Sequence, residues 1–316
     1  MTANRIMTIP LLGAPGIQLT NTTLKENLTD ATTQFSSISA LMRRFEPDGI
    51  FFMMDLTVEA QALGLQIGFP DNENPYVKEH SLKTPDDLVA IKENWKGLSG
   101  RMKVFVEVAR MMTQNLSGLK GGYVIGPFSL AGELVGVTDM CMLLLDEPQF
   151  AQQIIQFCSD AVTEYAEALF DQGLDVIAML EPTAVLLSKK QFSDFALPYF
   201  SSVLSSLDKP LIYHICGNTQ HLVPNMGNSG AYGLSLDSMV DLKEVAEAIP
   251  KDVKIIGNLD PVKIFLQSSP QQVSEATHQL LNRMKGIPNF ILSSGCDIPH
   301  NVPLENIDAF IQAARS

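Results

Sequence analysis

Short hydrophobic runs alternate with longer segments of helical periodicity along most of the chain. Eight runs rich in β-branched and apolar residues recur, at residues 6–12, 49–55, 121–128, 175–182, 210–217, 232–237, 254–261 and 290–296. Their nearly continuous hydrophobicity is typical of strands that are buried on both faces, as in a parallel sheet covered by helices. The alternation therefore predicts repeated strand–helix units.

The segments between the runs carry signals for helix starts and ends. The clearest helix is 148–172, which follows Asp146 and Glu147 and ends before Gly173. Acidic residues before a helix and glycine after it favour those boundaries. Similar patterns predict helices at 240–249, 270–284 and 303–314. Residues 57–120 are too long for one crossover, so we expect extra helices there, one of them starting at 84–86, and a turn-rich loop at 70–75.

Eight strands alternating with helices over 316 residues predict an α/β fold, a (β/α)₈ TIM barrel with extra helices after the second strand. We expect a single domain spanning residues 1–316, because no linker or internal repeat divides the chain. An open doubly wound sheet is the main alternative. It is disfavoured because residues 13–16, after the first run, lack the glycine spacing of a dinucleotide-binding turn.

Composition narrows the classes of partner. The chain is 46% hydrophobic and 18% charged, as expected of a globular protein, and its net charge is −13. Such an acidic chain should repel phosphate backbones and anionic lipids, so we expect neither nucleic-acid nor membrane binding. No apolar run is long enough to span a bilayer. Four cysteines are too few for a disulfide framework, which predicts reduced thiols and a cytoplasmic location.

The ends of the predicted strands concentrate residues that can bind metals or protons. In a barrel, function gathers at the C-terminal ends of the strands. Those ends carry Asp55, Phe128, Glu181, His214, Cys216, Asp237, Asp260 and Cys296. His214 and Cys216 are two residues apart on one strand, so their side chains point to the same face. With Cys296 they could form a Cys₂His set with an open position, as in catalytic zinc sites; the alternative is a packed strand pair and a buried thiol.

Five segments resemble the uroporphyrinogen decarboxylase superfamily and, within it, the zinc-dependent methylcobamide:coenzyme M methyltransferase-like branch. They are residues 56–64, 126–132, 214–218, 257–261 and 294–299. The segment 257–261 is shared across the superfamily, whereas 214–218 and 294–299 are specific to the branch. The resemblance implies a zinc-dependent methyltransferase that moves a methyl group from a methylated corrinoid, either methylcobalamin or a corrinoid on a separate carrier protein. The acceptor would be a thiol such as coenzyme M, or another small molecule such as tetrahydrofolate.

The resemblance also implies which residues form the site. It places Zn²⁺ on His214, Cys216 and Cys296, and it places Asp237 where the branch has a carboxylate on the next strand. A member of the branch has glutamate there, so Asp237 is either the fourth ligand or a partner that orients His214. Asp237 and Glu181 are the candidate catalytic carboxylates, although hydrogen bonding to loop backbone is an alternative role for Glu181.

Two other functions stay open. A uroporphyrinogen decarboxylase, which is a lyase, binds a polycarboxylate, yet the loop at 12–20 has no arginine or lysine and no arginine lies at a predicted strand mouth. The sulfonate of coenzyme M would also need a cation that the sequence does not reveal. A non-catalytic barrel that binds a corrinoid protein is the other possibility, and its histidine and cysteines would serve packing.

Overall fold

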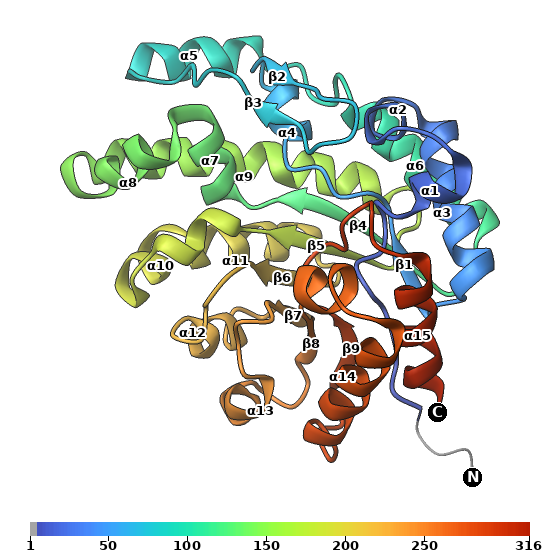
Figure 1. Ribbon diagram of the computed structural model, residues 1–316. Helices are drawn as coiled ribbons and strands as arrows, with labels where there is room; N and C mark the ends of the chain where they lie inside the picture. The colour runs from blue at the N-terminus through green and yellow to red at the C-terminus, as the bar shows by residue number, and fades with distance from the viewer. Residues whose placement is uncertain (1–4) are drawn as a thin grey trace.

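The computed structural model describes residues 5–316, and its centre is a sheet of seven parallel strands (Figure 1). The order in the sheet follows the chain: β1 (Gly49–Phe51), β4 (Leu119–Ile125), β5 (Val176–Leu180), β6 (Leu211–Ile215), β7 (Gly233–Leu236), β8 (Lys254–Leu259) and β9 (Phe290–Ser294). All seven strands are mostly or fully buried. Sequential order with a helical crossover between most neighbours is the topology of a TIM barrel, so the predicted fold class is confirmed.

The first predicted strand, 6–12, closes the barrel without forming a regular strand. Thr8 makes an isolated parallel bridge to Leu292 on β9, and the Ile9 N–H donates to the Leu292 carbonyl at 2.9 Å. On its other side, the Asp48 N–H donates to the Thr8 carbonyl at 3.0 Å, just before β1. The N–H groups of Ile9 and Leu11 face β9, so Pro10, which has no N–H, interrupts backbone pairing on the side that faces β1. The segment lies between β9 and β1 and occupies the eighth position of the barrel.

Helices surround the sheet on its outer side (Figure 1). They are α1 (Gly16–Thr20), α2 (Leu24–Thr29), α3 (Ala31–Phe45), α4 (Val58–Ala62), α5 (Pro85–Asn94), α6 (Met102–Asn115), α7 (Pro127–Val135), α8 (Val137–Asp146), α9 (Pro148–Phe170), α10 (Lys189–Phe195), α11 (Leu197–Leu207), α12 (Val223–Gly227), α13 (Leu242–Val245), α14 (Pro270–Arg283) and α15 (Leu304–Arg315). The predicted helices 148–172, 270–284 and 303–314 match α9, α14 and α15 to within two residues. The predicted helix 240–249 is shorter, because α13 passes into one 3₁₀ turn.

The long insertion after β1 holds the expected extra helices, α4, α5 and α6, and also a two-stranded antiparallel hairpin that the sequence did not reveal. The hairpin strands are β2 (Ile67–Gly68) and β3 (Tyr76–Val77), and the predicted loop 70–75 joins them. Helix α5 begins as predicted: Thr84 and Asp87 form a capping box, with Pro85 in the first turn.

The prediction of a strand at 121–128 is wrong at its end. Strand β4 stops at Ile125, and Pro127 begins α7, because proline at the first helical position needs no hydrogen-bond partner for its nitrogen. Phe128 is therefore a buried residue of α7 and not a strand end. Within residues 5–316 no single helix is long and apolar enough to span a membrane; α7 and α8 reach that length together but are bent by 105°.

Candidate metal centre at the mouth of the barrel

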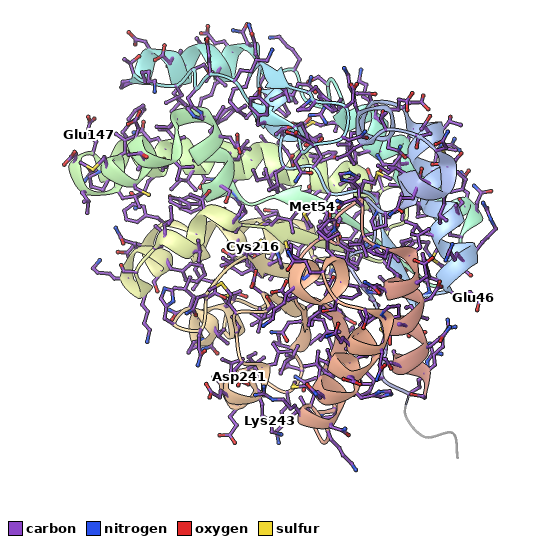
Figure 2. The ribbon with its side chains drawn as sticks, viewed as in Figure 1. Glu46, Met54, Glu147, Cys216, Asp241 and Lys243 are labelled. Atoms are coloured by element: carbon purple, nitrogen blue, oxygen red, sulfur yellow. The ribbon has the colours of Figure 1, made fainter. Side chains whose placement is uncertain are left out.

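Three side chains converge at the C-terminal ends of β6 and β9. The ligand atoms of His214, Cys216 and Cys296 all lie within 4.8 Å of one another. His214 Nε2 is 3.0 Å from Cys216 Sγ and 3.8 Å from Cys296 Sγ, and the two sulfurs are 3.5 Å apart. Figure 2 shows Cys216 near the centre of the molecule, at the end of its strand. Residues 82 positions apart are thus brought to one point by the barrel.

These distances fit a tetrahedral metal ion. With Zn–S bonds of about 2.3 Å and Zn–N bonds of about 2.0 Å, neighbouring ligand atoms lie about 3.5–3.8 Å apart. The spacings of 3.0, 3.5 and 3.8 Å require changes of about half an ångström at most. Two thiols and one imidazole are a donor set that suits zinc, and three protein ligands leave a fourth position for another group.

Strand β7 orients the imidazole. His214 on β6 pairs in register with Ser235 on β7, so the two side chains share a face of the sheet. Nδ1 of His214 lies 2.9 Å from the Ser235 hydroxyl and 3.1 Å from the Ser235 carbonyl. A proton held on Nδ1 by these oxygens leaves the lone pair of Nε2 directed at the thiols. This second interaction of a ligating histidine is typical of metal sites.

The two thiols influence each other's protonation. The Cys296 thiol donates to the sulfur of Cys216, and this hydrogen bond lowers the pKa of Cys216 against the effect of burial. The same interaction, together with burial, raises the pKa of Cys296. A metal ion held here would bind both sulfurs as thiolates and would displace the thiol protons.

Gly295 allows Cys296 to reach this point. A Cβ on Gly295 would lie only 2.6 Å from the Ser238 nitrogen and 3.3 Å from the Asp237 carbonyl carbon, in the loop that follows β7. Glycine is therefore needed for close approach of two backbones. The end of β9 can pass close to the β7 loop and present Cys296 to His214.

A cavity of about 520 Å³ opens over the candidate metal centre. Cys216 and Cys296 form part of its wall, and so does Asp297, the residue after the second cysteine. The loop 72–75 between β2 and β3 covers one side, and residues 299–301 form another. His300 therefore lies at the mouth of the cavity. The insertion after β1 is thus part of the site.

The two predicted catalytic carboxylates have other partners. Asp237 follows β7 and accepts a hydrogen bond from the Met239 N–H at 2.9 Å, and no carboxylate belongs to the cluster of His214, Cys216 and Cys296. Glu181 is fully buried after β5 and accepts from the backbone N–H groups of the first turn of α7, at Phe128 and Ser129. Burial raises the pKa of Glu181 to about 7. The catalytic role of both residues stays a prediction.

Asp260 and the other two cysteines lie apart from the cluster. Asp260 caps the turn Pro261–Leu266, accepting from the Val262 and Lys263 N–H groups at 2.8 Å each. Cys141 and Cys158 belong to α8 and α9, and Cys158 is completely buried.

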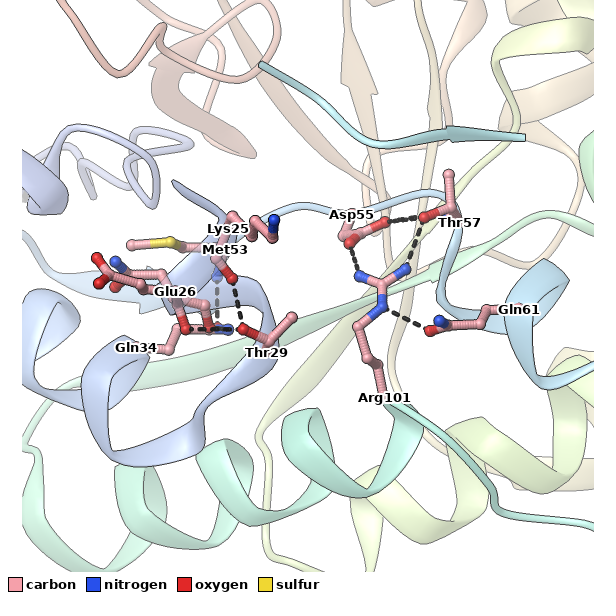
Figure 3. A network of polar contacts seen from close by, with 10 residues as sticks. Lys25, Glu26, Thr29, Gln34, Met53, Asp55, Thr57, Gln61 and Arg101 are labelled. Carbon is pink, nitrogen blue, oxygen red and sulfur yellow. Dashed lines mark hydrogen bonds and ion pairs between the residues drawn. The ribbon is translucent and has the colours of Figure 1, made fainter. Parts of the chain in front are cut away.

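An arginine does lie beside a strand end, contrary to the sequence-based expectation. Arg101, just before α6, is 6% exposed and forms an ion pair with Asp55 in the segment that follows β1 (Figure 3). Its guanidinium also donates to Thr57 at 2.7 Å and Gln61 at 2.6 Å. The sequence could not reveal this because Arg101 comes from the insertion, whose path only the fold defines. The pair neutralises the Asp55 carboxylate, which lines the cavity.

Two buried carboxyl groups near the mouth were missed by the sequence reasoning. Glu59 on α4 accepts from the Ile125 N–H at 2.9 Å, while its second oxygen is buried without a partner, and burial raises the pKa of Glu59 to about 8. Asp297 has a buried Oδ1 without a partner, and burial raises its pKa. Both lie in segments that carried the resemblance, but their burial had no sequence signal.

The fold and the cluster together give the class of this protein. It is a TIM barrel with a candidate metal centre at the C-terminal ends of its strands. The chain belongs to the uroporphyrinogen decarboxylase family: the family model "Uroporphyrinogen decarboxylase (URO-D)" matches residues 15–316. It is 32% identical over 273 residues to "Methylcobamide:CoM methyltransferase MtbA" of Methanosarcina acetivorans, covering 83% of this chain and 78% of that protein. It is also 25% identical over 287 residues to the uroporphyrinogen decarboxylase of Prochlorococcus marinus, covering 87% and 80%.

The solved structures agree on the fold. A methyltransferase from Methanosarcina mazei superposes with a TM-score of 0.87 at 22% identity, covering 99% of this chain and 94% of that one. A B12-independent methionine synthase from a Shewanella species superposes with a TM-score of 0.64 at 15% identity, covering 90% and 86%. The expected family, and the expected enzyme class of methyltransferase, are confirmed by the sequence relatives.

Proposed function

We propose that this protein transfers a methyl group from a methylated corrinoid to a small thiol, using a zinc ion bound by His214, Cys216 and Cys296. The observation that carries the proposal is the convergence of these three ligand atoms within 4.8 Å at the floor of a cavity. The relatives named methylcobamide:CoM methyltransferase support the reaction class. A relative named "Methylated-thiol--coenzyme M methyltransferase", 25% identical over 268 residues, supports a sulfur-containing methyl acceptor.

The proposed zinc ligands, one imidazole and two thiolates, suit methyl transfer to a thiol. A free thiol with a pKa of about 8.5 is mostly protonated at neutral pH. A bound Zn²⁺ would deprotonate the acceptor thiol and hold its sulfur at the mouth. The two cysteine thiolates offset the charge of the ion, so the acceptor sulfur stays nucleophilic. In the transfer itself, a sulfur–carbon bond forms as the cobalt–carbon bond breaks, and the electron pair stays on cobalt, which passes from cobalt(III) to cobalt(I).

The cavity also indicates how the donor arrives. A volume of about 520 Å³ suits a small acceptor, so the much larger corrinoid would approach from outside the mouth, presented by a separate carrier protein. Asp237 would act from beyond the metal ligands, because its carboxylate does not belong to the cluster of His214, Cys216 and Cys296. The reduced, closely spaced thiols are consistent with a cytoplasmic protein.

Decarboxylation of a uroporphyrinogen is disfavoured by the same cavity. Its described lining contains three carboxylates and no lysine or arginine. Arg101 forms an ion pair with Asp55 and is not part of the cavity lining. A polycarboxylate would therefore find no lysine or arginine in the described lining to pair with its carboxylates.

The test is a paired measurement on purified protein. Metal content is determined by mass spectrometry, and demethylation of methylcobalamin is followed through the absorbance of cob(I)alamin with a panel of thiols and tetrahydrofolate. We expect about one zinc per chain and cob(I)alamin formation that is lost in Cys216→Ala but kept in Cys141→Ala. Zinc-loaded protein that forms no cob(I)alamin with any acceptor would refute the methyltransferase proposal.

A further inference from the structure

The segment 257–261 is one of those that resemble the family, but the function proposed above assigns it no role. Asn258 lies near the end of β8, and its side-chain amide donates to two backbone carbonyls, at 2.8 Å to Asp237 and at 2.7 Å to Val240. The Val240 N–H also donates to the Asp237 carbonyl, at 3.0 Å. Asn258 is therefore hydrogen-bonded to both ends of the turn 237–240, which follows β7.

The turn 237–240 packs directly against the residue that precedes Cys296. A Cβ placed on Gly295 would lie only 2.6 Å from the Ser238 nitrogen, so the two backbones are in close contact. The Gly295 N–H also donates at 2.7 Å to the carbonyl of Leu259, the last residue of β8. Strand β8 and the turn therefore both contact Gly295, and together they fix where the backbone enters Cys296.

Cys296 depends on such contacts more than His214 does. His214 lies within β6 and is held by strand pairing, whereas β9 ends at Ser294, so Cys296 lies beyond the ladder. Its sulfur is 3.5 Å from that of Cys216 and 3.8 Å from His214 Nε2. Metal–ligand distances are kept to within about 0.2 Å, so a shift of about one ångström in the backbone before Cys296 would take its sulfur out of reach of the ion.

We propose that Asn258 is a positioning residue for the metal centre: it holds the turn 237–240 against Gly295 and thereby keeps Cys296 where its sulfur can bind zinc. This inference rests on the function proposed above. Asn258 belongs neither to the ligand cluster nor to the lining of the mouth cavity, so it acts through the turn alone. Its amide suits the role because it offers two N–H donors, one for each carbonyl.

The test compares Asn258→Leu and Asn258→Ala with the same two changes at Asn306. Asn306 on α15 is a matched control: its side-chain amide also donates to two backbone carbonyls, at 2.7 Å to Phe265 and at 2.8 Å to Ser268, and neither belongs to the turn 237–240 or to the metal centre. Leucine keeps most of the side-chain volume and removes both donors, whereas alanine removes the volume as well. Urea unfolding of the metal-free protein should show lower stability for all four variants, because each loses two hydrogen bonds.

Metal binding then separates positioning from stability. Zinc affinity, measured by competition with a chromogenic chelator, should fall by about tenfold in both Asn258 variants and stay within about twofold in both Asn306 variants. Co²⁺ bound in place of zinc should show weaker sulfur-to-cobalt charge-transfer absorption in the Asn258 variants alone, because one thiolate is displaced. In a Cys296→Ala background, Asn258→Leu should lower zinc affinity no further, because its effect passes through that thiol.

The outcomes separate the two proposals. Zinc affinity and Co²⁺ absorption that are unchanged in both Asn258 variants overturn the inference and leave the proposed function standing. Equal losses of zinc affinity in the Asn258 and Asn306 variants also overturn it, because they would follow from stability alone. A further loss when Asn258→Leu is added to Cys296→Ala does the same. Wild-type protein that binds neither zinc nor Co²⁺ instead overturns the zinc-dependent function, and with it the inference.

Discussion

Two cysteines of this chain should respond in opposite ways to removal of the thiol. Cys296 belongs to the candidate metal centre and is partly exposed in the cavity wall, whereas Cys158 is completely buried in α9 and lies outside the cluster. Cys296→Ala should abolish tight zinc binding with little effect on the fold. Cys158→Ala should weaken the fold with no effect on zinc.

The magnitudes follow from the surroundings. Removing a residue that merely orients a metal ligand costs about 10–100-fold in metal affinity, so loss of a direct ligand should exceed about 100-fold, or about 2.7 kcal/mol. Deleting the buried sulfur of Cys158 removes one group of about methylene size and leaves a small cavity, which should cost about 1–2 kcal/mol. For a chain of this length that corresponds to a decrease in Tm of a few degrees.

The assay measures the two properties separately. Zinc affinity is obtained by competition with a chromogenic chelator, and stability by urea unfolding of metal-free protein, because bound zinc would itself stabilise the folded state. Zinc affinity that is unchanged in Cys296→Ala, or a loss of stability there as large as in Cys158→Ala, would refute the assignment of Cys296 as a ligand and support a packing role.

Four further changes test other parts of the site. Ser235→Ala removes one of the two oxygens that hold His214 Nδ1, so chelator competition should show zinc affinity lowered by about tenfold, the low end of the usual range. Gly295→Ala should lower it as well, because the new Cβ collides with Ser238; unchanged affinity would argue that the β9 end is not held there. Arg101→Met leaves Asp55 buried and unpaired and should cost about 3–5 kcal/mol in urea unfolding. The pKa of Glu59 is about 8 in the fold against 4.5 as a free group, so its contribution to stability is lost as pH rises between these values; Glu59→Gln should flatten that part of the decline, and a parallel pH profile would contradict the buried-acid assignment.

The sequence predicted the strands well where they are buried on both faces and poorly where proline or an irregular path intervenes. The runs at 175–182, 210–217 and 290–296 contain β5, β6 and β9. A short run that is apolar on both faces is buried on both faces when it forms a strand of a parallel sheet covered by helices. The run at 6–12 has a similar apolar composition, but it makes only an isolated bridge to β9, and Pro10 lacks the N–H that would pair on the β1 side. At 121–128 the apolar pattern continued into α7, and hydrophobicity alone could not mark the change at Pro127.

For the site, the sequence revealed residues that are close in the chain or fixed to strand ends. His214 and Cys216 share a strand face, and Cys296 follows the last strand, so barrel topology alone brings them together. Arg101 and the loop 72–75 come from an insertion whose path depends on tertiary packing, so no local pattern could place them at the mouth. The hydrogen bond from His214 to Ser235 depends on strand register, which the run boundaries do not specify.

The candidate metal centre and the cavity over it are built on different kinds of structure: the centre on buried strands, much of the cavity wall on loops. His214 and Ser235 sit inside buried strands, so their positions are fixed by the core of the barrel. Much of the cavity wall comes instead from the loops at 72–75 and 299–301, whose side chains can change without altering the strands. If the proposed function holds, a change of acceptor would require new loop residues but no new metal ligands. In kinetic terms, substitutions in the loops should act mainly on KM for the thiol, and substitutions at the strand ends should act on kcat.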